Sequence, residues 1–391
     1  MNSEAASSVR RMGREESLAL NAAESKERKI LLSAPPRLIT LGAHSCCNAR
    51  CVFCPEGKFP RFSLARYKEF FEARLGHFIR QAEKVTFTGF GETLWMPEAA
   101  EFLDYLNETI PETWKIFTTN GTPLRPAVIE RLLKSKYAIQ VSLHASKPDL
   151  HEALTGLRGA FEPVVSGVRE LCRMRKEQGL GQSLHVVLVD VLTTRNIDDL
   201  PDFVRMARSL DVPEVQCSYV TAFEEAHLPL SCFFEPDRAN RAIAAAEAVI
   251  EGLRKDADPE EFKHFSVRLP QRFGAGKDDL SDAVCPEPWE HVYVEGQGPV
   301  LPCCQWGEHV GNLERGDDMD ALWNSPFYQG LRRAMVKGPL HPWCAQCSRH
   351  RGWNVDRLAS HLTNRPEAQA RLTLAARRMG LPVELSLGAR S

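Results

Sequence analysis

The sequence contains no run of eighteen apolar residues, so it offers no candidate transmembrane helix. Residues 1–29 carry charges throughout and lack the apolar centre of a secretory signal peptide. The sequence also lacks an excess of charge of one sign. Its formal net charge of −2 over 391 residues gives no reason to expect a nucleic-acid or membrane partner. Together these absences predict a globular protein of the cytoplasm.

Cysteine, in contrast, is abundant. Twelve cysteines in a chain without an export signal argue against a disulfide framework. Seven of them fall into two sets with ligand-like spacing, which favours metal binding. The first set is Cys47, Cys51 and Cys54, and the second is Cys285, Cys303, Cys344 and Cys347.

Short apolar runs alternate with helix-like stretches along the first two thirds of the chain. The predicted strands are Arg37–Gly42, Lys84–Gly89, Trp114–Thr119, Ile139–His144, Leu184–Leu192 and Glu214–Val220. The amphipathic segments between them are Pro97–Leu106, Pro126–Lys134, Phe161–Lys176 and Leu200–Leu210. This alternation predicts βαβ units with a parallel sheet. Six units are too few for a closed eight-stranded barrel, so we expect an α/β fold that forms a partial (β/α)6 barrel resembling a TIM barrel.

The composition changes along the chain and suggests five segments. Residues 1–35 read as a polar leader, mobile or weakly helical. Residues 36–255 form the barrel, and residues 256–284 form a polar linker. Residues 285–363 read as a small α+β domain, with a hairpin of Val292–Glu295 and Pro299–Pro302 and a helix near Asp318–Met335. Residues 364–391 are predicted to be a helical tail.

The first cysteine set lies directly after the first predicted strand, at Cx3Cx2C spacing. Short loops of this kind deliver thiolates to iron–sulfur clusters. Three ligands for a 4Fe–4S cluster would leave one iron open to an exogenous ligand. The structural alternative is a zinc site, which would need a fourth ligand such as His44. Cys46 is too close to Cys47 to serve the same cluster.

This loop, with Phe53 just before its last cysteine, resembles the signature of the radical S-adenosylmethionine (SAM) superfamily. The turn Gly89-Phe90-Gly91-Glu92 resembles the family's GGE motif, although Phe90 makes it a variant. Glycines there permit close backbone approach, and a carboxylate accepts hydrogen bonds from an ammonium group. The resemblance implies a SAM-binding 4Fe–4S cluster, with SAM cleaved reductively to a 5′-deoxyadenosyl radical that abstracts hydrogen from the substrate.

The same resemblance implies that two further residues contact SAM. Ser142, at the end of the fourth predicted strand, would contact the ribose of SAM. Arg158 would reach the SAM carboxylate. The structural alternatives, a strand serine and a surface arginine, stay open for both residues.

The second cysteine set sits in a stretch that closely resembles the SPASM auxiliary-cluster extension, or its shortened twitch form. The four thiolates alone fit zinc as well as 4Fe–4S. Since no cysteine follows Cys347, the resemblance implies one auxiliary 4Fe–4S cluster. The spacing after Gly298 favours Cys303 over Cys304 as a ligand, without deciding between them.

A fully ligated auxiliary cluster suits electron transfer, which predicts an oxidoreductase that dehydrogenates its substrate. The polar N-terminal segment favours a small sugar or cyclitol over a peptide. The alternatives are a peptide maturase and a redox-neutral epimerase in which Cys217 donates hydrogen. Against that role, Cys217 also reads as a small core residue.

The resemblance further implies a flavodoxin or ferredoxin as electron donor. A hypothesis of another class is a non-catalytic iron–sulfur or zinc protein.

Overall fold

Short runs rich in apolar and β-branched residues form the strands, which pair into one 10-stranded sheet in the computed structural model. The structure describes residues 9–43, 46–55, 61–274, 284–347, 358–363 and 365–383. The strands are β1 Leu38–Gly42, β2 Lys84–Thr88, β3 Trp114–Thr119, β4 Tyr137–Ser142, β5 Leu184–Leu192, β6 Glu214–Tyr219, β7 Ser266–Arg268, β8 His291–Val294, β9 Pro299–Leu301 and β10 Gly311–Asn312.

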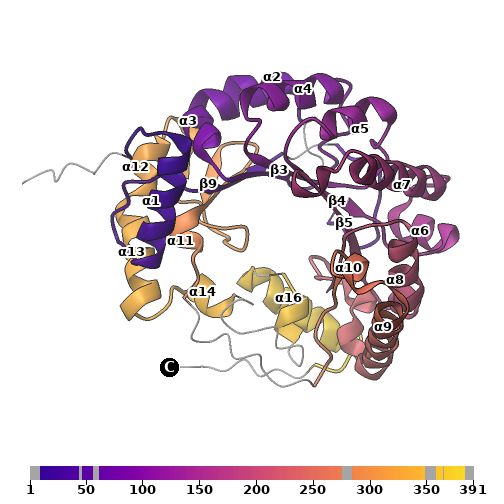
Figure 1. The fold of residues 1–391 in the computed structure, drawn as a ribbon. Helices are drawn as coiled ribbons and strands as arrows, with labels where there is room; N and C mark the ends of the chain where they lie inside the picture. Colours follow the sequence, from indigo (N-terminus) through magenta and orange to yellow (C-terminus); the bar gives the residue numbers. More distant parts are fainter. Residues whose placement is uncertain are drawn as a thin grey trace, which may run out of the picture.

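The strand order is β10-β9-β8-β1-β2-β3-β4-β5-β6-β7, and every pair from β8 to β7 is parallel. The strands curve into an open arc with helices on its outer side (Figure 1). The helices are α1 Arg14–Lys26, α2 Leu64–Arg66, α3 Ala73–Gln81, α4 Ala99–Thr109, α5 Pro126–Leu132, α6 Pro148–Thr155, α7 Phe161–Glu177, α8 Leu200–Ser209, α9 Pro236–Asp256, α10 Pro259–Phe262, α11 Glu287–Glu290, α12 Met319–Trp323, α13 Pro326–Lys337, α14 Pro342–Gln346 and α16 Pro366–Arg378.

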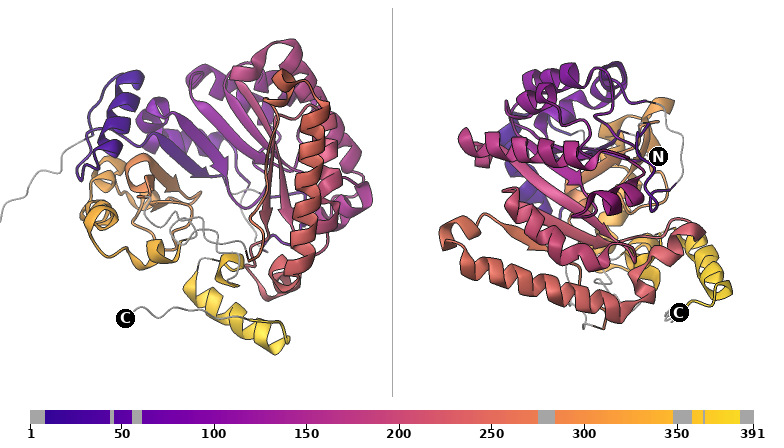
Figure 2. Two further views of the ribbon diagram at one scale, coloured as in Figure 1. Left: turned by 60° about the horizontal axis from the view of Figure 1, so that its bottom comes forward. Right: turned by 90° about the vertical axis from the view of Figure 1, so that its right-hand side faces the viewer.

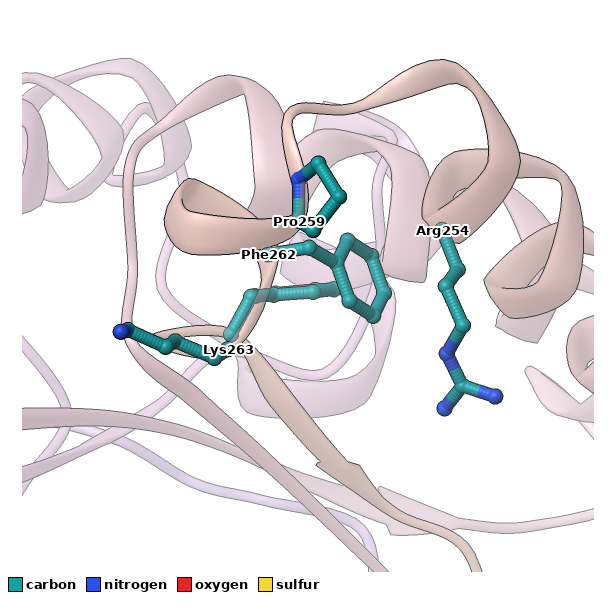
Figure 3. Close-up of a pocket in the computed structure, with 5 residues that line it drawn as sticks. Arg254, Pro259, Phe262 and Lys263 are labelled. Atoms are coloured by element: carbon teal, nitrogen blue, oxygen red, sulfur yellow. The ribbon is translucent and has the colours of Figure 1, made fainter.

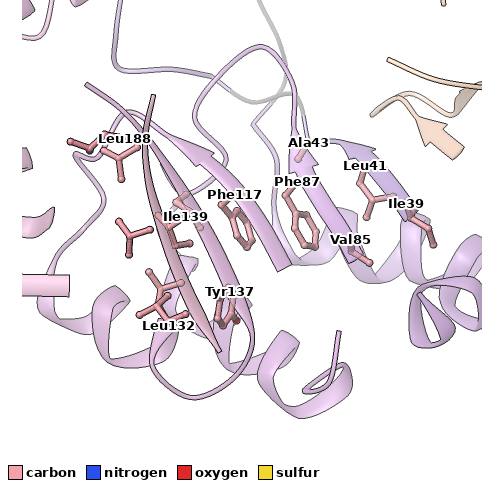
Figure 4. Packing of buried hydrophobic residues seen from close by; sticks show 14 of the residues in the cluster. Ile39, Leu41, Ala43, Val85, Phe87, Phe117, Leu132, Tyr137, Ile139 and Leu188 are labelled. Atoms are coloured by element: carbon pink, nitrogen blue, oxygen red, sulfur yellow. The ribbon is translucent and has the colours of Figure 1, made fainter. Parts of the chain in front are cut away.

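The core lies between the sheet and its helices. Side chains of alternate strand residues pack there, as Figure 4 shows for Leu41, Val85 and Phe87. The rings of Phe87 and Phe117 stack with centroids 4.7 Å apart. The other face of the sheet is more polar: on it the hydroxyl of Thr118 donates to the side chain of Gln140 across 3.0 Å. The predicted α/β fold and partial barrel are therefore confirmed.

The predicted linker over 256–284 is wrong where the structure describes it. Helix α9 runs to Asp256, α10 follows, and β7 adds a further parallel strand beside β6. Residues 275–283 lie outside the described residues. Strand β7 is hard to predict from the sequence, because it has three residues and two of them are exposed.

The hairpin of the C-terminal region is continuous with the barrel sheet. Strand β8 pairs parallel to β1, and β9 pairs antiparallel to β8. The hairpin thus falls close to its predicted position and extends the same sheet. The helix expected near Asp318–Met335 is two helices, α12 and α13, because the chain bends at Asn324 and Ser325.

The N-terminal segment, expected to be a mobile or weakly helical leader, contains helix α1 where the structure describes it. Helix α1 packs beside the C-terminal helices, where Figure 2 shows its indigo ribbon against the orange ones. The Asn21 amide donates to the carbonyls of Pro35 and Trp289, each across 2.9 Å. In return, the Trp289 indole donates to the carbonyl of Lys29 across 2.7 Å.

The segment after α1 is held just as firmly. Trp323 donates to the carbonyl of Ala34 across 3.0 Å, and the buried Arg332 donates to the carbonyl of Ile30 across 3.0 Å. We call residues 9–36 the N-terminal strap. It fixes the C-terminal helices against the barrel.

The predicted helical tail is present as α16. Its buried residues Leu372, Ala375 and Ala376 pack in a second small core with Ala222 and Leu228, which follow β6. Among the described residues, no helix has both the length and the apolar character needed to cross a membrane.

Candidate functional site

Three loops meet where β1, β2 and β3 end. The cysteine loop follows β1, the turn from Gly89 to Thr93 follows β2, and the turn at Asn120 follows β3. Hydrogen bonds join them: the backbone N–H of Asn120 donates to the Glu92 carboxylate across 2.5 Å, and Thr93 donates to the carbonyl of Ala43 across 3.3 Å. Ligands of parallel α/β folds gather at this edge of the sheet.

The cysteine loop is anchored by its backbone. Arg50 and Val52 donate their N–H groups to the carbonyls of Thr155 and Leu154, across 2.8 and 2.9 Å. These carbonyls stand at the end of helix α6. Two alternate residues of the loop are thereby held to helix α6.

The thiols of this loop lie close enough to affect one another. Burial, together with the charges of Cys54 and Cys47, raises the pKa of Cys51 to about 12. Burial also raises the pKa of Cys47 and of Cys54. Without a cation the three thiols therefore stay protonated at neutral pH. A bound cluster would displace these protons.

The donor set of this loop is three thiols, which suits an iron–sulfur cluster that takes one thiolate per iron. Thiolates on a tetrahedral zinc all lie about 2.3 Å from the same ion. On a 4Fe–4S cube each thiolate binds a different iron, so the sulfurs stand farther apart. His44, the proposed fourth zinc ligand, lies outside the described residues.

Glu92 is almost fully buried, with 1% of its surface exposed. Besides Asn120, the backbone N–H of Leu94 donates to its carboxylate across 3.2 Å. Burial outweighs these hydrogen bonds and raises the pKa of Glu92 to about 7. The carboxylate has about four lone-pair positions, so it can accept further hydrogen bonds from a ligand.

The glycines beside Glu92 have the backbone that the motif requires. Gly89 and Gly91 have φ values of 154° and 126°, and both are exposed at the mouth of the barrel. Only glycine adopts the conformation of Gly91 without strain. The variant residue Phe90 packs edge-on against Phe223, with ring centroids 6.2 Å apart.

A polar network that the sequence did not reveal supports the cysteine loop from β3. The Asn120 amide donates to the Asn48 side chain across 2.7 Å, and it lies 3.8 Å from the Cys47 sulfur. Asn48 donates to the hydroxyl of Thr122 across 3.0 Å. The segment at Asn120 was singled out by its position after a strand, but the roles of Asn48 and Thr122 depend on contacts that the sequence does not show.

A second feature missed by the sequence analysis is the loop after β6, which reaches the cysteine loop. His227 is 3% exposed and hydrogen-bonds to the backbone of Cys54. Burial raises the pKa of Cys54, and the charges of Cys47 and Glu224 add to the effect. Together with Phe223, this loop bridges the mouth of the barrel from β6 to β2.

The remaining predicted SAM-binding residues are spread around the mouth. The ring of Phe53 meets that of His144 edge-on at 4.9 Å, just beyond β4. Ser142 ends β4 and is half-buried on the polar face of the sheet. Arg158 is exposed in the loop after α6 and makes no hydrogen bond or ion pair with the described residues. All three lie at the edge where the cysteines stand, and their roles remain predictions.

Cys217 does not face this mouth, so its position contradicts the proposed role as a hydrogen donor. It is 5% exposed and packs in the hydrophobic core with Val215 and Tyr219, on the helix side of β6. Its exposed neighbour Gln216 points to the opposite face. Burial raises the pKa of Cys217 well above its usual value, so it is a core thiol.

The thiols of the second cysteine set lie close enough for their charges to affect one another. Burial raises the pKa of Cys344 to about 12, with the charges of Cys285 and Cys347 adding to the effect. Burial raises the pKa of both Cys303 and Cys304, and the charge of Cys347 contributes in each case. Cys303 is the less exposed of the adjacent pair, which favours it as the ligand.

The hollow drawn in Figure 3 is remote from both cysteine sets. It has a volume of about 400 Å³ and lies between the end of α9 and α10, against Phe262 and Phe265. Its cations are engaged locally: Arg254 pairs with Glu251 across 3.3 Å. It contributes nothing to the site described above.

Comparisons with known proteins agree with this geometry. Residues 44–207 match the model of the radical SAM superfamily. Residues 285–348 match the model of SPASM, an iron–sulfur cluster-binding domain. The first domain implies a 4Fe–4S cluster and SAM, and the second implies additional iron–sulfur binding.

Two curated relatives match large parts of the chain. The subtilosin biosynthesis protein AlbA of Bacillus subtilis is 21% identical over 322 residues, which cover 77% of this chain and 64% of AlbA. The PqqA peptide cyclase of Ruegeria pomeroyi is 26% identical over 241 residues, 59% of this chain and 58% of the cyclase. The chain thus spans less than two thirds of either relative.

Solved structures share the fold. SuiB of Streptococcus suis bound to S-adenosylmethionine has a TM-score of 0.57 at 15% identity, covering 86% of this chain and 76% of SuiB. SuiB bound to its precursor peptide SuiA has a TM-score of 0.55 at 14% identity, covering 90% and 80%. The protein anSMEcpe with bound AdoMet and a peptide has a TM-score of 0.55 at 17% identity, covering 88% and 98%.

Proposed function

The chain is a radical SAM protein with a C-terminal SPASM domain. From this premise we infer that it oxidises a carbon atom of a peptide substrate. The observation that carries the proposal is the meeting of the cysteine loop with Glu92 and Asn120 at the strand ends. That arrangement places three thiols, an exposed glycine turn and a buried carboxylate around one mouth.

The chain's own residues bind and orient the reactants. Cys47, Cys51 and Cys54 hold the first cluster, and the exposed backbone of Gly89 and Gly91 lets the methionine part of SAM approach closely. When bound, the two clusters supply the electron that cleaves SAM and an acceptor for the electron released by the substrate. The loop after β6 limits the access of water to this place.

Several observations support a peptide rather than a sugar as the substrate. The curated relatives are named for subtilosin biosynthesis and for cyclisation of the PqqA peptide, and SuiB binds a precursor peptide. The preference for a sugar rested on the polar N-terminal segment. Since that segment is a strap against the C-terminal helices, its polarity says nothing about the substrate.

The second cysteine set supports oxidation over redox-neutral chemistry. In an oxidation the substrate carbon loses a hydrogen atom to the 5′-deoxyadenosyl radical, then a proton to a base and one electron to the second cluster. A redox-neutral reaction needs a hydrogen donor at the mouth, and the candidate Cys217 is buried on the other face of β6. The first cluster is reduced by a flavodoxin or ferredoxin in this proposal.

The proposal is tested with reconstituted protein, dithionite and SAM. Cleavage of SAM to 5′-deoxyadenosine is expected even without substrate. With short peptides encoded near the gene, mass spectrometry should find a product lighter by two hydrogen atoms, and deuterium from the oxidised carbon should appear in 5′-deoxyadenosine. Failure to cleave SAM would revive the hypothesis of a non-catalytic iron–sulfur or zinc protein. If the protein oxidised a cyclitol but no peptide, the substrate would belong to the sugar or cyclitol class and the peptide proposal would be wrong.

A further inference from the structure

The loop after β6, residues 222–231, is clamped by a segment that comes just before α16. Ala222, the first residue of the loop, donates its N–H to the carbonyl of His361 across 2.7 Å and accepts a hydrogen bond from the N–H of Thr363 across 3.0 Å. These two bonds form a parallel bridge between Ala222 and Leu362. The start of the loop is therefore held by the same kind of backbone pairing as a strand.

The same segment also holds the end of this loop. His361 is buried, and its Nδ1 lies 3.1 Å from the hydroxyl of Ser231. The rings of Tyr219 and Phe233 pack against that of His361, with centroids 5.6 and 5.3 Å away. Because both ends of the loop are fixed in this way, the residues between them have a defined position.

Phe223 is the second residue of this loop. Its backbone N–H donates to Nδ1 of the buried His227 across 3.2 Å. Its half-buried ring meets that of Phe90 edge-on, with the centroids 6.2 Å apart and the planes at 89°. Aromatic pairs prefer this arrangement. The contact joins the loop after β6 to the turn after β2.

Phe90 stands between Gly89 and Gly91 in the turn that leads to Glu92. Glycine populates many backbone conformations, so the two glycines do not fix the shape of the turn by themselves. At its other end the turn is held by the hydrogen bond from the backbone N–H of Asn120 to the Glu92 carboxylate. On the glycine side, the ring of Phe90 is the side chain through which the surrounding protein can hold the turn.

We propose that Phe223 is a positioning residue for SAM: its ring holds Phe90 and so keeps the backbone of Gly89 and Gly91 in the shape that receives SAM. Phe223 acts through Phe90 and takes no part in electron transfer or hydrogen abstraction. Without the ring, the turn populates other shapes, and the affinity for SAM falls in proportion to the receptive fraction. The proposal rests on SAM binding at this turn, as in the proposed function, and does not depend on the substrate.

The first test measures the turn itself and needs no SAM. In hydrogen-exchange experiments on the metal-free chain, the backbone amides of Phe90, Gly91 and Glu92 should exchange faster in Phe223→Ala than in wild type. Phe223→Tyr retains the ring and should restore slow exchange. Ser231→Ala removes the bond to His361 and should speed exchange of the same amides. Wild-type exchange at the turn in Phe223→Ala or in Ser231→Ala overturns the proposal.

The second test is a double-mutant cycle on SAM affinity, measured with reconstituted protein. Phe223→Ala should lower the affinity by about two- to tenfold, as expected for the loss of one aromatic pair, while the spectrum of the first cluster stays intact. In the Phe90→Ala background the same change should have no further effect. Additive losses overturn the proposal, because they would mean that Phe223 acts on SAM independently of Phe90.

The matched control is Phe262→Ala, which breaks another edge-on pair, with the Phe265 ring at 5.9 Å, on α10. It should change neither the affinity for SAM nor the exchange of the turn. Equal effects in this variant would mean that Phe223 acts through general stability, which also overturns the proposal. If wild type bound no SAM, the proposed function would fail, whereas exchange in the metal-free chain would still decide whether Phe223 holds the turn.

Discussion

The side-chain amide of Asn120 lies 3.8 Å from the sulfur of Cys47 and joins the end of β3 to the cysteine loop after β1. The same amide holds Asn48, so one side chain fixes the loop at two neighbouring positions. The backbone of Asn120 also bonds to Glu92. This residue therefore connects all three loops of the site.

Replacing Asn120 by Ala should loosen the first cluster. A hydrogen bond to a charged sulfur is worth about 1.5–3 kcal/mol, so loss of iron to a chelator should be about tenfold faster or more. The control is Asn107→Ala, which removes a comparable bond to the carbonyl of Arg131 between helices α4 and α5. Equal iron loss in the two variants would mean that Asn120 acts only through general stability.

The iron content should reflect both cysteine sets. Anaerobically reconstituted protein should hold about eight irons, and the protein with Ala at Cys47, Cys51 and Cys54 should hold about four. Ala at Cys46 should leave the count unchanged, because its sulfur is engaged by Arg61 across 3.4 Å. Stoichiometric zinc on the second set after native anaerobic purification would contradict the electron-transfer role.

Glu92→Gln should weaken SAM binding and alter the pH dependence of stability. The pKa of Glu92 is raised to about 7 in the folded chain from 4.5. Its protonated form is therefore favoured by folding: this stability is fully present below pH 4.5 and is lost as the pH rises through 7, on the order of 3 kcal/mol in all. Denaturant titrations of metal-free wild type should show this loss, and those of Glu92→Gln should lack it.

SAM affinity supplies the second readout for Glu92. Loss of a charge-assisted hydrogen bond should cost about 1.5–3 kcal/mol in binding while the cluster spectrum stays intact. An unchanged affinity for SAM in Glu92→Gln would mean that Glu92 only holds the loops together and does not bind SAM.

Changing Cys344 and Cys347 to Ala should separate the roles of the two clusters. SAM cleavage should continue with dithionite, while oxidised product should be lost for want of an electron acceptor. Circular dichroism and the remaining iron must be measured first, since the cluster also stabilises the surrounding fold. Product formed at the wild-type rate by the folded variant would make the second cluster structural.

Cys217→Ala should leave SAM cleavage and product formation intact. Its sulfur lies in the core, so the expected effect is a small loss of stability from the missing volume, about 1 kcal/mol. The comparison is Cys172→Ala, another buried thiol, on α7. A specific loss of product in Cys217→Ala would restore the redox-neutral mechanism.

The parts of the structure that the sequence predicts are those with local patterns. The six barrel strands are short apolar runs, and the cysteine loop follows the first of them as expected. The burial of Cys217 in the core could also have been predicted from the sequence. Alternate residues of a strand share one face, so Cys217 lies on the same face as Val215 and Tyr219. Spacing singled out the two cysteine sets, whose roles as ligands stay predictions.

The missed parts depend on distant partners. Helix α1 buries Ser17, Asn21 and Glu24, polar residues that give no amphipathic signal. The Asn21 amide, for example, donates to the carbonyl of Trp289, which lies 268 residues away in the chain. The contact of His227 with the cysteine loop is likewise invisible in the sequence, since it joins the ends of β6 and β1.

The N-terminal strap also determines the order in which the protein is assembled during synthesis. Ile30 and Ala34 leave the ribosome early, yet their partners Arg332 and Trp323 lie about 300 residues later in the chain. The barrel strands can pair before then, because their contacts are shorter in range. These two contacts cannot form until translation has passed residue 332, so the strap docks on the C-terminal helices late in synthesis.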